Sequence, residues 1–177
     1  MTEAIGAVID RYVRAVPDWP EPGVTFRDIT PLLEDADGLR QTIDAFVEAA
    51  RALGPVDKVI GIEARGFIFA PAVAVALGAG FVPVRKEGKL PVARHAVSYS
   101  LEYGSATIEM HTDAIAQGER VLVIDDVLAT GGTMAAVDEL AQLAGGTIVG
   151  DLVLIELSAL GGRAKLGDNT VVALHTY

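Results

Sequence analysis

The chain has 177 residues, of which 51% are hydrophobic, so it is long enough for one well-buried domain and too short for two of ordinary size. It contains no cysteine, which excludes a disulfide framework, a thiolate metal site and a cysteine nucleophile. Fourteen basic residues against 24 acidic ones give a net charge of -10, which argues against nucleic acids and anionic membranes as partners.

The N-terminal region is expected to form two helices joined by a stiff connector. Glu3 stands where a secretory signal would carry basic residues, and no apolar stretch reaches a membrane-spanning length, so we expect a cytoplasmic protein. Apolar spacing over 5–16 predicts an amphipathic helix with Thr2 as its N-cap. Prolines and glycine over 17–23 end this helix. A second helix is predicted over 37–53, before Gly54-Pro55.

Beyond residue 55, short apolar runs alternate with segments of helical length. They predict strands at 56–61, 81–85, 106–111, 120–124, 148–156 and 171–174, and helices at 65–77 and 133–144. Strands alternating with crossover helices form a mainly parallel sheet with helices on both faces, so we predict a single α/β domain. Residues 1–34 would form an appendage to it. Residues 86–104 break the pattern, and a loop of that length is either an active-site lid or a solvated connection.

The strongest indication of chemistry is the stretch 121–133, VLVIDDVLATGGT. A buried strand ends in Asp125 and Asp126, and a loop of small residues leads into a helix. Ligands of open α/β sheets lie beyond the carboxyl ends of the strands, where loop N–H groups and a helix N-terminus can surround a phosphate. The expected phosphate-binding residues are Ala129, Thr130, Gly131, Gly132 and Thr133. Carboxylates repel phosphate but accept hydrogen bonds from vicinal hydroxyls, so the pattern predicts a ribose 5-phosphate site. A strand-to-helix turn with a capping or Mg²⁺-binding Asp is the alternative.

This stretch resembles the signature of the type I phosphoribosyltransferases, which use 5-phosphoribosyl 1-pyrophosphate. Other segments that fit the family are 22–31, 61–67, 85–91, 99–104, 156–158 and 162–163, and they cover nearly the whole chain in the expected order. The chain is similar to the members that use adenine. The resemblance implies that adenine and phosphoribosyl pyrophosphate give AMP and pyrophosphate, with Mg²⁺ carried by the phosphoribosyl substrate. It also implies a homodimer, and a non-proline cis peptide at Glu63-Ala64.

An anionic substrate of an acidic protein needs a local cluster of basic residues. Arg65 opens a helix after a buried strand, where its guanidinium could hold pyrophosphate through two N–H groups. Arg85, Lys86, Lys89 and Arg94 place four of the 14 basic residues within ten positions, as a polyanion site would require, although a solvated charged loop is the alternative. The resemblance assigns Lys86 and Lys89 to pyrophosphate, with Arg65 counted among the catalytic residues. Arg85 and Arg94 receive no role.

The resemblance also assigns the proton-transfer residue and the purine site. Glu102 would exchange a proton with the purine N7, and Tyr103 would help to close the lid. Closure would remove water and raise the pKa of the Glu102 carboxyl group toward neutrality. Phe26 would stack on adenine, the backbone of Arg27 would pair with its 6-amino group and a ring nitrogen, and Leu157 would line the pocket. Without the resemblance, an exposed carboxylate and ordinary core packing are the simpler readings of Glu102 and Phe26.

Two rival functions stay open. The nearer one is phosphoribosyl transfer to a 6-oxopurine or a pyrimidine. The other is a non-catalytic sensor that binds the phosphoribosyl ligand and regulates transcription. Such a sensor would need an added DNA-binding domain with a basic surface, and we expect the chain to have neither. His95, His111 and His175 are scattered along the chain, and none is predicted to bind a metal.

Overall fold

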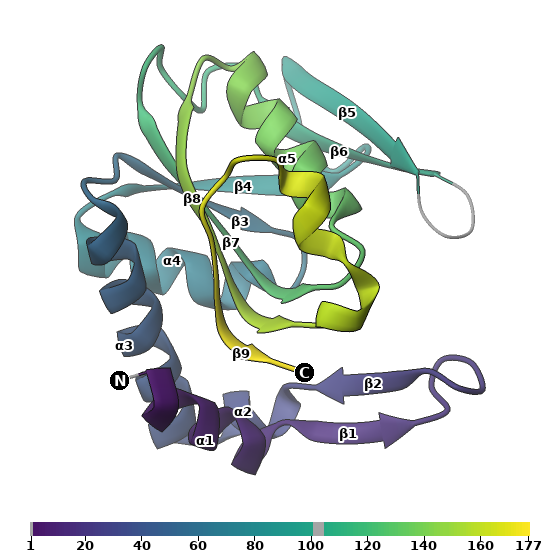
Figure 1. The fold of residues 1–177 in the computed structure, drawn as a ribbon. Coiled ribbons are helices and arrows are strands. Elements are labelled where there is room, and N and C mark those ends of the chain that lie inside the picture. Colours follow the sequence, from purple (N-terminus) through teal and green to yellow (C-terminus); the bar gives the residue numbers. More distant parts are fainter. Residues whose placement is uncertain (1, 101–104) are drawn as a thin grey trace. The chain divides into compact units, whose positions relative to one another are not determined.

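The computed structural model describes residues 2–100 and 105–177 (Figure 1). The chain divides into an N-terminal unit, Met1–Ala45, and a C-terminal unit, Phe46–Tyr177. Helix α3, Ala36–Leu53, runs across this boundary and confirms the helix predicted over 37–53.

The N-terminal unit combines short helices with a β-hairpin. Its elements before α3 are α1 (Thr2–Tyr12), β1 (Arg14–Pro17), β2 (Thr25–Asp28) and α2 (Thr30–Glu34). The helix predicted through residue 16 ends at Tyr12, because the following residues enter β1 and Val16 pairs with Phe26 of β2. The proline after Val16 favours this extended backbone. Strands β1 and β2 form an antiparallel pair.

The described part of the C-terminal unit contains seven strands in one sheet. They are β3 (Lys58–Ile62), β4 (Gly80–Lys86), β5 (Arg94–Ser100), β6 (Ser105–His111), β7 (Arg120–Leu128), β8 (Thr147–Glu156) and β9 (Val171–Thr176). The strand order is β5-β6-β4-β3-β7-β8-β9. The five neighbouring strands β4, β3, β7, β8 and β9 run parallel. Strands β5 and β6 join the edge at β4 in antiparallel pairing. The predicted mainly parallel sheet is confirmed.

Helices α4 (Gly66–Leu77) and α5 (Gly132–Leu143) cover opposite faces of this sheet. Ile60 and Ile62 of β3 belong to the apolar core that includes Val137 of α5. Gly61 faces α4 on the opposite side of the sheet, since a Cβ there would lie 2.8 Å from Cβ of Ala70 in that helix. Successive side chains of a strand alternate between faces, which places one helix on each side. The two helices predicted at 65–77 and 133–144 are thereby confirmed.

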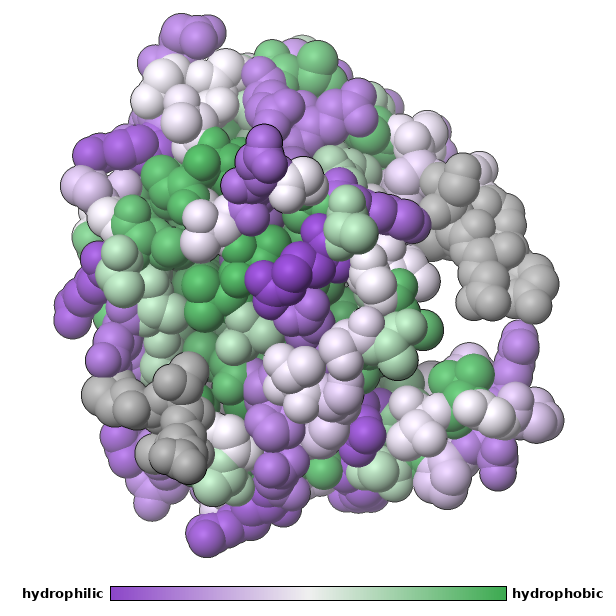
Figure 2. Space-filling view, in the orientation of Figure 1, coloured by the Kyte–Doolittle hydropathy of each residue, from purple (hydrophilic) through white to green (hydrophobic). Residues whose placement is uncertain are grey.

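Part of the surface of the C-terminal unit is apolar. Hydrophobic side chains gather over β8 and the edge strand β9 in the space-filling view (Figure 2). Ile68 and Val75 of α4 and Phe81 of β4 are also exposed, by 41%, 82% and 37%. Even so, none of the helices in the described ranges is long and apolar enough to cross a membrane.

The segment 86–104 is not the continuous loop that the sequence predicted. Residues 94–100 form β5, which pairs with β6 along its whole length. Val97 is buried, and the hydroxyl groups of Ser98 and Thr107 lie 2.9 Å apart across the pair. Pairing with β6 creates this strand, whereas its own sequence has too little apolar alternation to predict it. Glu102 and Tyr103 lie outside the described residues.

Candidate active site

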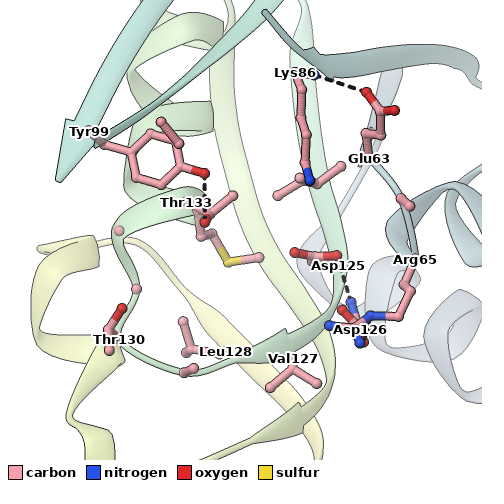
Figure 3. A pocket seen from close by; sticks show the side chains of 17 residues that line it. Glu63, Arg65, Lys86, Tyr99, Asp125, Asp126, Val127, Leu128, Thr130 and Thr133 are labelled. Atoms are coloured by element: carbon pink, nitrogen blue, oxygen red, sulfur yellow. Dashed lines mark hydrogen bonds and ion pairs between the residues drawn. The ribbon is translucent and has the colours of Figure 1, made fainter. Parts of the chain in front are cut away.

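A cavity of about 340 Å³ lies at the carboxyl ends of β3 and β7 in the C-terminal unit (Figure 3). It is the position at which an open α/β sheet binds ligands. The predicted site residues that line it are Arg65, Lys86, Asp125, Asp126, Ala129, Thr130, Gly131, Gly132 and Thr133. The structure therefore brings together the acidic pair, the small-residue loop and two of the three cations expected to bind pyrophosphate.

The loop between β7 and α5 has the geometry of an anion-binding turn. Gly131 precedes the helix with a φ of +77°, a conformation that favours glycine, and a Cβ there would lie 2.2 Å from the carbonyl oxygen of Gly162. Helix α5 begins at Gly132, so the N–H groups of its first turn have no intrahelical partners. The hydroxyl of Thr133 donates to Oη of Tyr99 at 3.1 Å. This arrangement suits an anion at the positive end of α5.

Asp125 and Asp126 lie within β7, and Asp126 is buried. Oδ1 of Asp125 accepts the backbone N–H of Asp126 at 2.9 Å. Burial raises the pKa of Asp125 well above its ordinary range, and the charge of Asp126 adds to that effect. Burial also raises the pKa of Asp126, although the charge of Arg65 opposes it. These carboxyl groups are suited to hydrogen bonds with ligand hydroxyls.

Arg65 is held against the acidic pair. Its Nε lies 2.6 Å from Oδ2 of Asp126, a close ion pair without the alignment of a good hydrogen bond. The residue occupies the N-cap position of α4, and its side chain is 45% exposed. The peptide bond Glu63-Ala64 just before it is cis, as predicted. The guanidinium is therefore anchored at one edge and open to solvent at another.

Glu63 fixes the start of the basic segment. It accepts the backbone N–H of Lys86 at 2.9 Å and two N–H groups of Arg85 at 3.3 Å each, and these bonds, in that order, lower the pKa of Glu63. The side chain of Lys86 extends into the cavity toward Asp125 (Figure 3). Lys89 is not among the lining residues, but its carbonyl oxygen accepts an N–H of Arg85 at 3.4 Å. Arg85 thus links the Glu63 carboxylate to the backbone of Lys89.

Arg94 has a similar structural partner. Its Nε donates to Oε1 of the buried Glu109 at 2.6 Å, while Oε2 of Glu109 accepts the N–H of Gly88 at 3.0 Å. The sequence assigned no role to Arg85 and Arg94. Each pairs with a carboxylate, Glu63 or Glu109, that also accepts a backbone N–H of the segment 86–88.

A family model described as "Phosphoribosyl transferase domain" matches residues 34–168. The chain belongs to the phosphoribosyltransferase family. It is 57% identical over 176 residues to the adenine phosphoribosyltransferase of Thermobifida fusca, with 99% of each chain covered.

Solved structures of phosphoribosyltransferases have the same fold. The adenine phosphoribosyltransferase of Rhodothermus marinus is 48% identical, with a TM-score of 0.91 over 99% of both chains. That of Saccharomyces cerevisiae, solved with an imino-altritol bisphosphate and adenine, is 36% identical. Its TM-score is 0.92 over 97% of this chain and 99% of the yeast chain. The type I phosphoribosyltransferase fold predicted from the sequence is confirmed.

Leu157, one of the residues assigned to adenine, is not among the residues that line this phosphoribosyltransferase cavity. Phe26 and Arg27 lie on β2 of the N-terminal unit, where the Phe26 ring contacts that of Trp19 with centroids 4.4 Å apart. Leu157 follows β8, and its N–H donates to the carbonyl oxygen of Leu128 at 2.9 Å, next to the phosphate loop. The adenine contacts of all three residues stay predictions.

The lining residues that were not predicted include two polar ones, Glu63 and Tyr99. Glu63 lies in the turn before Arg65. Because an acid next to an expected anion site needs a cationic partner, its position could have indicated an ion pair with a nearby basic residue. Tyr99 lies in β5, inside the segment expected to be a loop. The three histidines do not line the cavity. Within residues 2–100 and 105–177, no cluster of three or more His, Asp or Glu side chains is placed to hold a metal ion.

Proposed function

We propose that this phosphoribosyltransferase transfers the 5-phosphoribosyl group from phosphoribosyl pyrophosphate to adenine, giving AMP and pyrophosphate in purine salvage. The observation that carries this proposal is the acidic pair beside the anion-binding loop in one cavity. Adenine as the acceptor is supported by relatives over the full chain that are named adenine phosphoribosyltransferases.

The 5-phosphate would bind in the loop 129–133. Its backbone N–H groups and the hydroxyls of Thr130 and Thr133 would donate to the phosphate oxygens, with the positive end of α5 directed at the same point. Asp125 and Asp126 would hydrogen-bond to the two ribose hydroxyls. Because the acids and the loop are fixed on β7 and α5, the sugar would be held with its anomeric carbon facing the basic residues.

Departure of pyrophosphate would be assisted by Arg65, Lys86 and Lys89. Mg²⁺ would enter as part of the phosphoribosyl pyrophosphate substrate and neutralise part of its charge. As positive charge grows at the anomeric carbon, the three cations would stabilise the leaving group, while Asp125 and Asp126 keep the sugar in position through its hydroxyls. No covalent intermediate with the protein is required. Catalysis would then consist of positioning and electrostatic stabilisation.

A second set of residues would recognise the base. Glu102 would exchange a proton with N7 of adenine, and Tyr103 would close over the site and exclude water. Phe26 would stack on the ring, Leu157 would line the pocket, and the carbonyl of Arg27 would accept from the 6-amino group. A 6-oxo base would leave that carbonyl unpaired, which is the physical basis for selecting adenine.

A homodimer in the cytoplasm is also part of the proposal. The exposed apolar side chains Ile68, Val75 and Phe81 offer a surface that a second copy would cover. The polyanionic substrates cannot cross a bilayer unaided, which favours an enzyme in the compartment where they are made. Sedimentation equilibrium of the wild-type protein beside Val75→Glu tests the dimer. A wild-type monomer, or a Val75→Glu dimer of equal strength, would contradict this interface.

Turnover separates the enzyme from the non-catalytic sensor. With adenine, Mg²⁺ and phosphoribosyl pyrophosphate, we expect continuous release of pyrophosphate in a coupled assay. Calorimetry on the same preparation measures binding of phosphoribosyl pyrophosphate alone. Tight binding without release of pyrophosphate with any base would favour the sensor and overturn the proposal.

A further inference from the structure

The short helix η2, Gly162–Leu166, supports the phosphate loop from outside the cavity. Gly162 is buried, and the contact is backbone to backbone. A Cβ at Gly162 would lie 2.2 Å from the carbonyl oxygen of Ala129 and 2.8 Å from the backbone nitrogen of Gly131. Gly162 has no left-handed backbone conformation, so alanine is excluded there by the contact alone. The position of the loop therefore depends on the position of Gly162.

Arg163 holds η2 in place through three polar contacts to two strands. Its Nε donates to Oε1 of Glu156 at 3.0 Å, and its Nη2 donates to Oε2 of the same carboxylate. Its Nη1 donates to the carbonyl oxygen of Val171 at 2.7 Å. Glu156 is the last residue of β8 and its side chain is 10% exposed, while Val171 is the first residue of β9. A planar guanidinium can satisfy this fork, whereas an ammonium group cannot.

The end of β8 is joined to the same loop on its other side. The N–H of Leu157 donates to the carbonyl oxygen of Leu128, the residue just before Ala129. Glu156 thus lies between two connections to the loop: one through the backbone of Leu157, and one through Arg163 and Gly162. Removing the ion pair would leave η2 free to move away from Ala129 and Gly131.

We infer that Arg163 and Glu156 are positioning residues for the substrate's 5-phosphate, acting through Gly162 on the loop 129–131. They do not line the cavity, so their effect is on the geometry of the backbone N–H groups that would receive the phosphate. The inference rests on the proposed role of this loop. It predicts a defect in binding the phosphoribosyl substrate that leaves the purine site unaffected.

The test compares Arg163→Gln, Glu156→Gln and Gly162→Ala with the wild type and with Lys165→Gln, which removes an exposed charge from the same helix. Loss of a charge-assisted fork should raise the KM for phosphoribosyl pyrophosphate about tenfold. The Kd of ribose 5-phosphate, measured by calorimetry, should rise by a similar factor. The KM for adenine should stay the same, and Arg163→Lys should fall between wild type and Arg163→Gln. Lys165→Gln should match the wild type.

The outcomes distinguish this inference from the proposed function. Failure of the wild-type protein to bind ribose 5-phosphate would overturn the role of the loop itself. Normal binding by the wild type and by all three variants would overturn only the positioning role. Equal increases in the KM for adenine and for phosphoribosyl pyrophosphate would indicate general damage and would also contradict it. If Arg163→Gln does not fold, Glu156→Gln and Gly162→Ala decide the question, because each leaves the guanidinium in place.

Discussion

The buried carboxyl groups of Asp138 in α5 and Asp151 in β8 make the stability of the C-terminal unit depend on pH. Nδ2 of Asn169 donates to Oδ2 of both, at 3.0 and 3.3 Å, and Oδ1 of each has no partner among the described residues. Burial, reinforced by the charge of Asp151, raises the pKa of Asp138 to about 8. Burial raises the pKa of Asp151 to about 6. We therefore predict that Asp138→Asn removes a loss of stability that the wild type shows as the pH rises from 6 to 8.

The magnitude follows from proton linkage. Between pH 6 and 8 the folded protein keeps a proton on Asp138 that the unfolded chain, with an ordinary pKa of 3.8, has lost. A raised pKa means that stability is greatest at low pH and falls as the pH rises toward the folded-state value. One extra proton in the folded state gives a slope of about 1.4 kcal/mol per pH unit, which falls to half of that as the pH reaches the folded-state pKa, so the loss over this window is roughly 2 kcal/mol. An amide at position 138 cannot titrate, so the slope of the variant should be smaller by that amount.

Urea unfolding of the wild type and Asp138→Asn at pH 6, 7 and 8 measures the difference directly. Asp113→Asn is the matched control, because it removes an exposed carboxylate and should follow the wild type. The difference in free energy of unfolding, Asp138→Asn minus wild type, should increase from pH 6 to 7 and again from pH 7 to 8. Parallel loss of stability in the two proteins would refute the reasoning that Asp138 is protonated in the fold.

Three further substitutions probe the core, the loop and the predicted proton-transfer residue. Phe69 is fully buried with its ring 5.5 Å from that of Phe46, so Phe69→Ala should lower the free energy of unfolding in urea by about 3–5 kcal/mol; a loss below 1 kcal/mol, on the order of a surface substitution, would contradict this packing. Gly131→Ala should abolish binding of ribose 5-phosphate in calorimetry, since its Cβ would collide with the Gly162 carbonyl; retained affinity would refute the loop geometry. Glu102→Ala should lower kcat strongly while phosphoribosyl pyrophosphate still binds, and an unchanged kcat would exclude Glu102 as the acid–base group.

The sequence predicted the helices and strands whose own residues carry a clear apolar pattern. The unbroken run 121–124 identified β7, and the helices α3, α4 and α5 followed from composition and terminators. Strands β1 and β5 were missed because partners stabilise them. Val16 is extended through its pairing with Phe26 and the proline that follows it, and residues 94–100 are ordered by the ladder with β6.

The site was predictable where its residues are contiguous. Asp125, Asp126 and the loop 129–133 lie within nine positions, so their order alone indicated a sugar phosphate. The contacts that support them join distant positions. Arg85 and Glu63 are 22 residues apart in the sequence. Gly162 contacts Ala129 and Gly131, which lie more than 30 residues before it. Such pairs depend on the order and register of the strands, which a single sequence does not determine.

The central claim, transfer of the phosphoribosyl group to adenine, is tested most directly by competition between bases. Adenine, hypoxanthine, guanine and orotate are mixed at equal concentration with Mg²⁺, phosphoribosyl pyrophosphate and the wild-type protein, and the nucleotides are separated and quantified at early times. AMP should form in large excess, with pyrophosphate released in equal amount. Predominant formation of IMP, GMP or orotidine 5-monophosphate, or no nucleotide at all, would contradict the account.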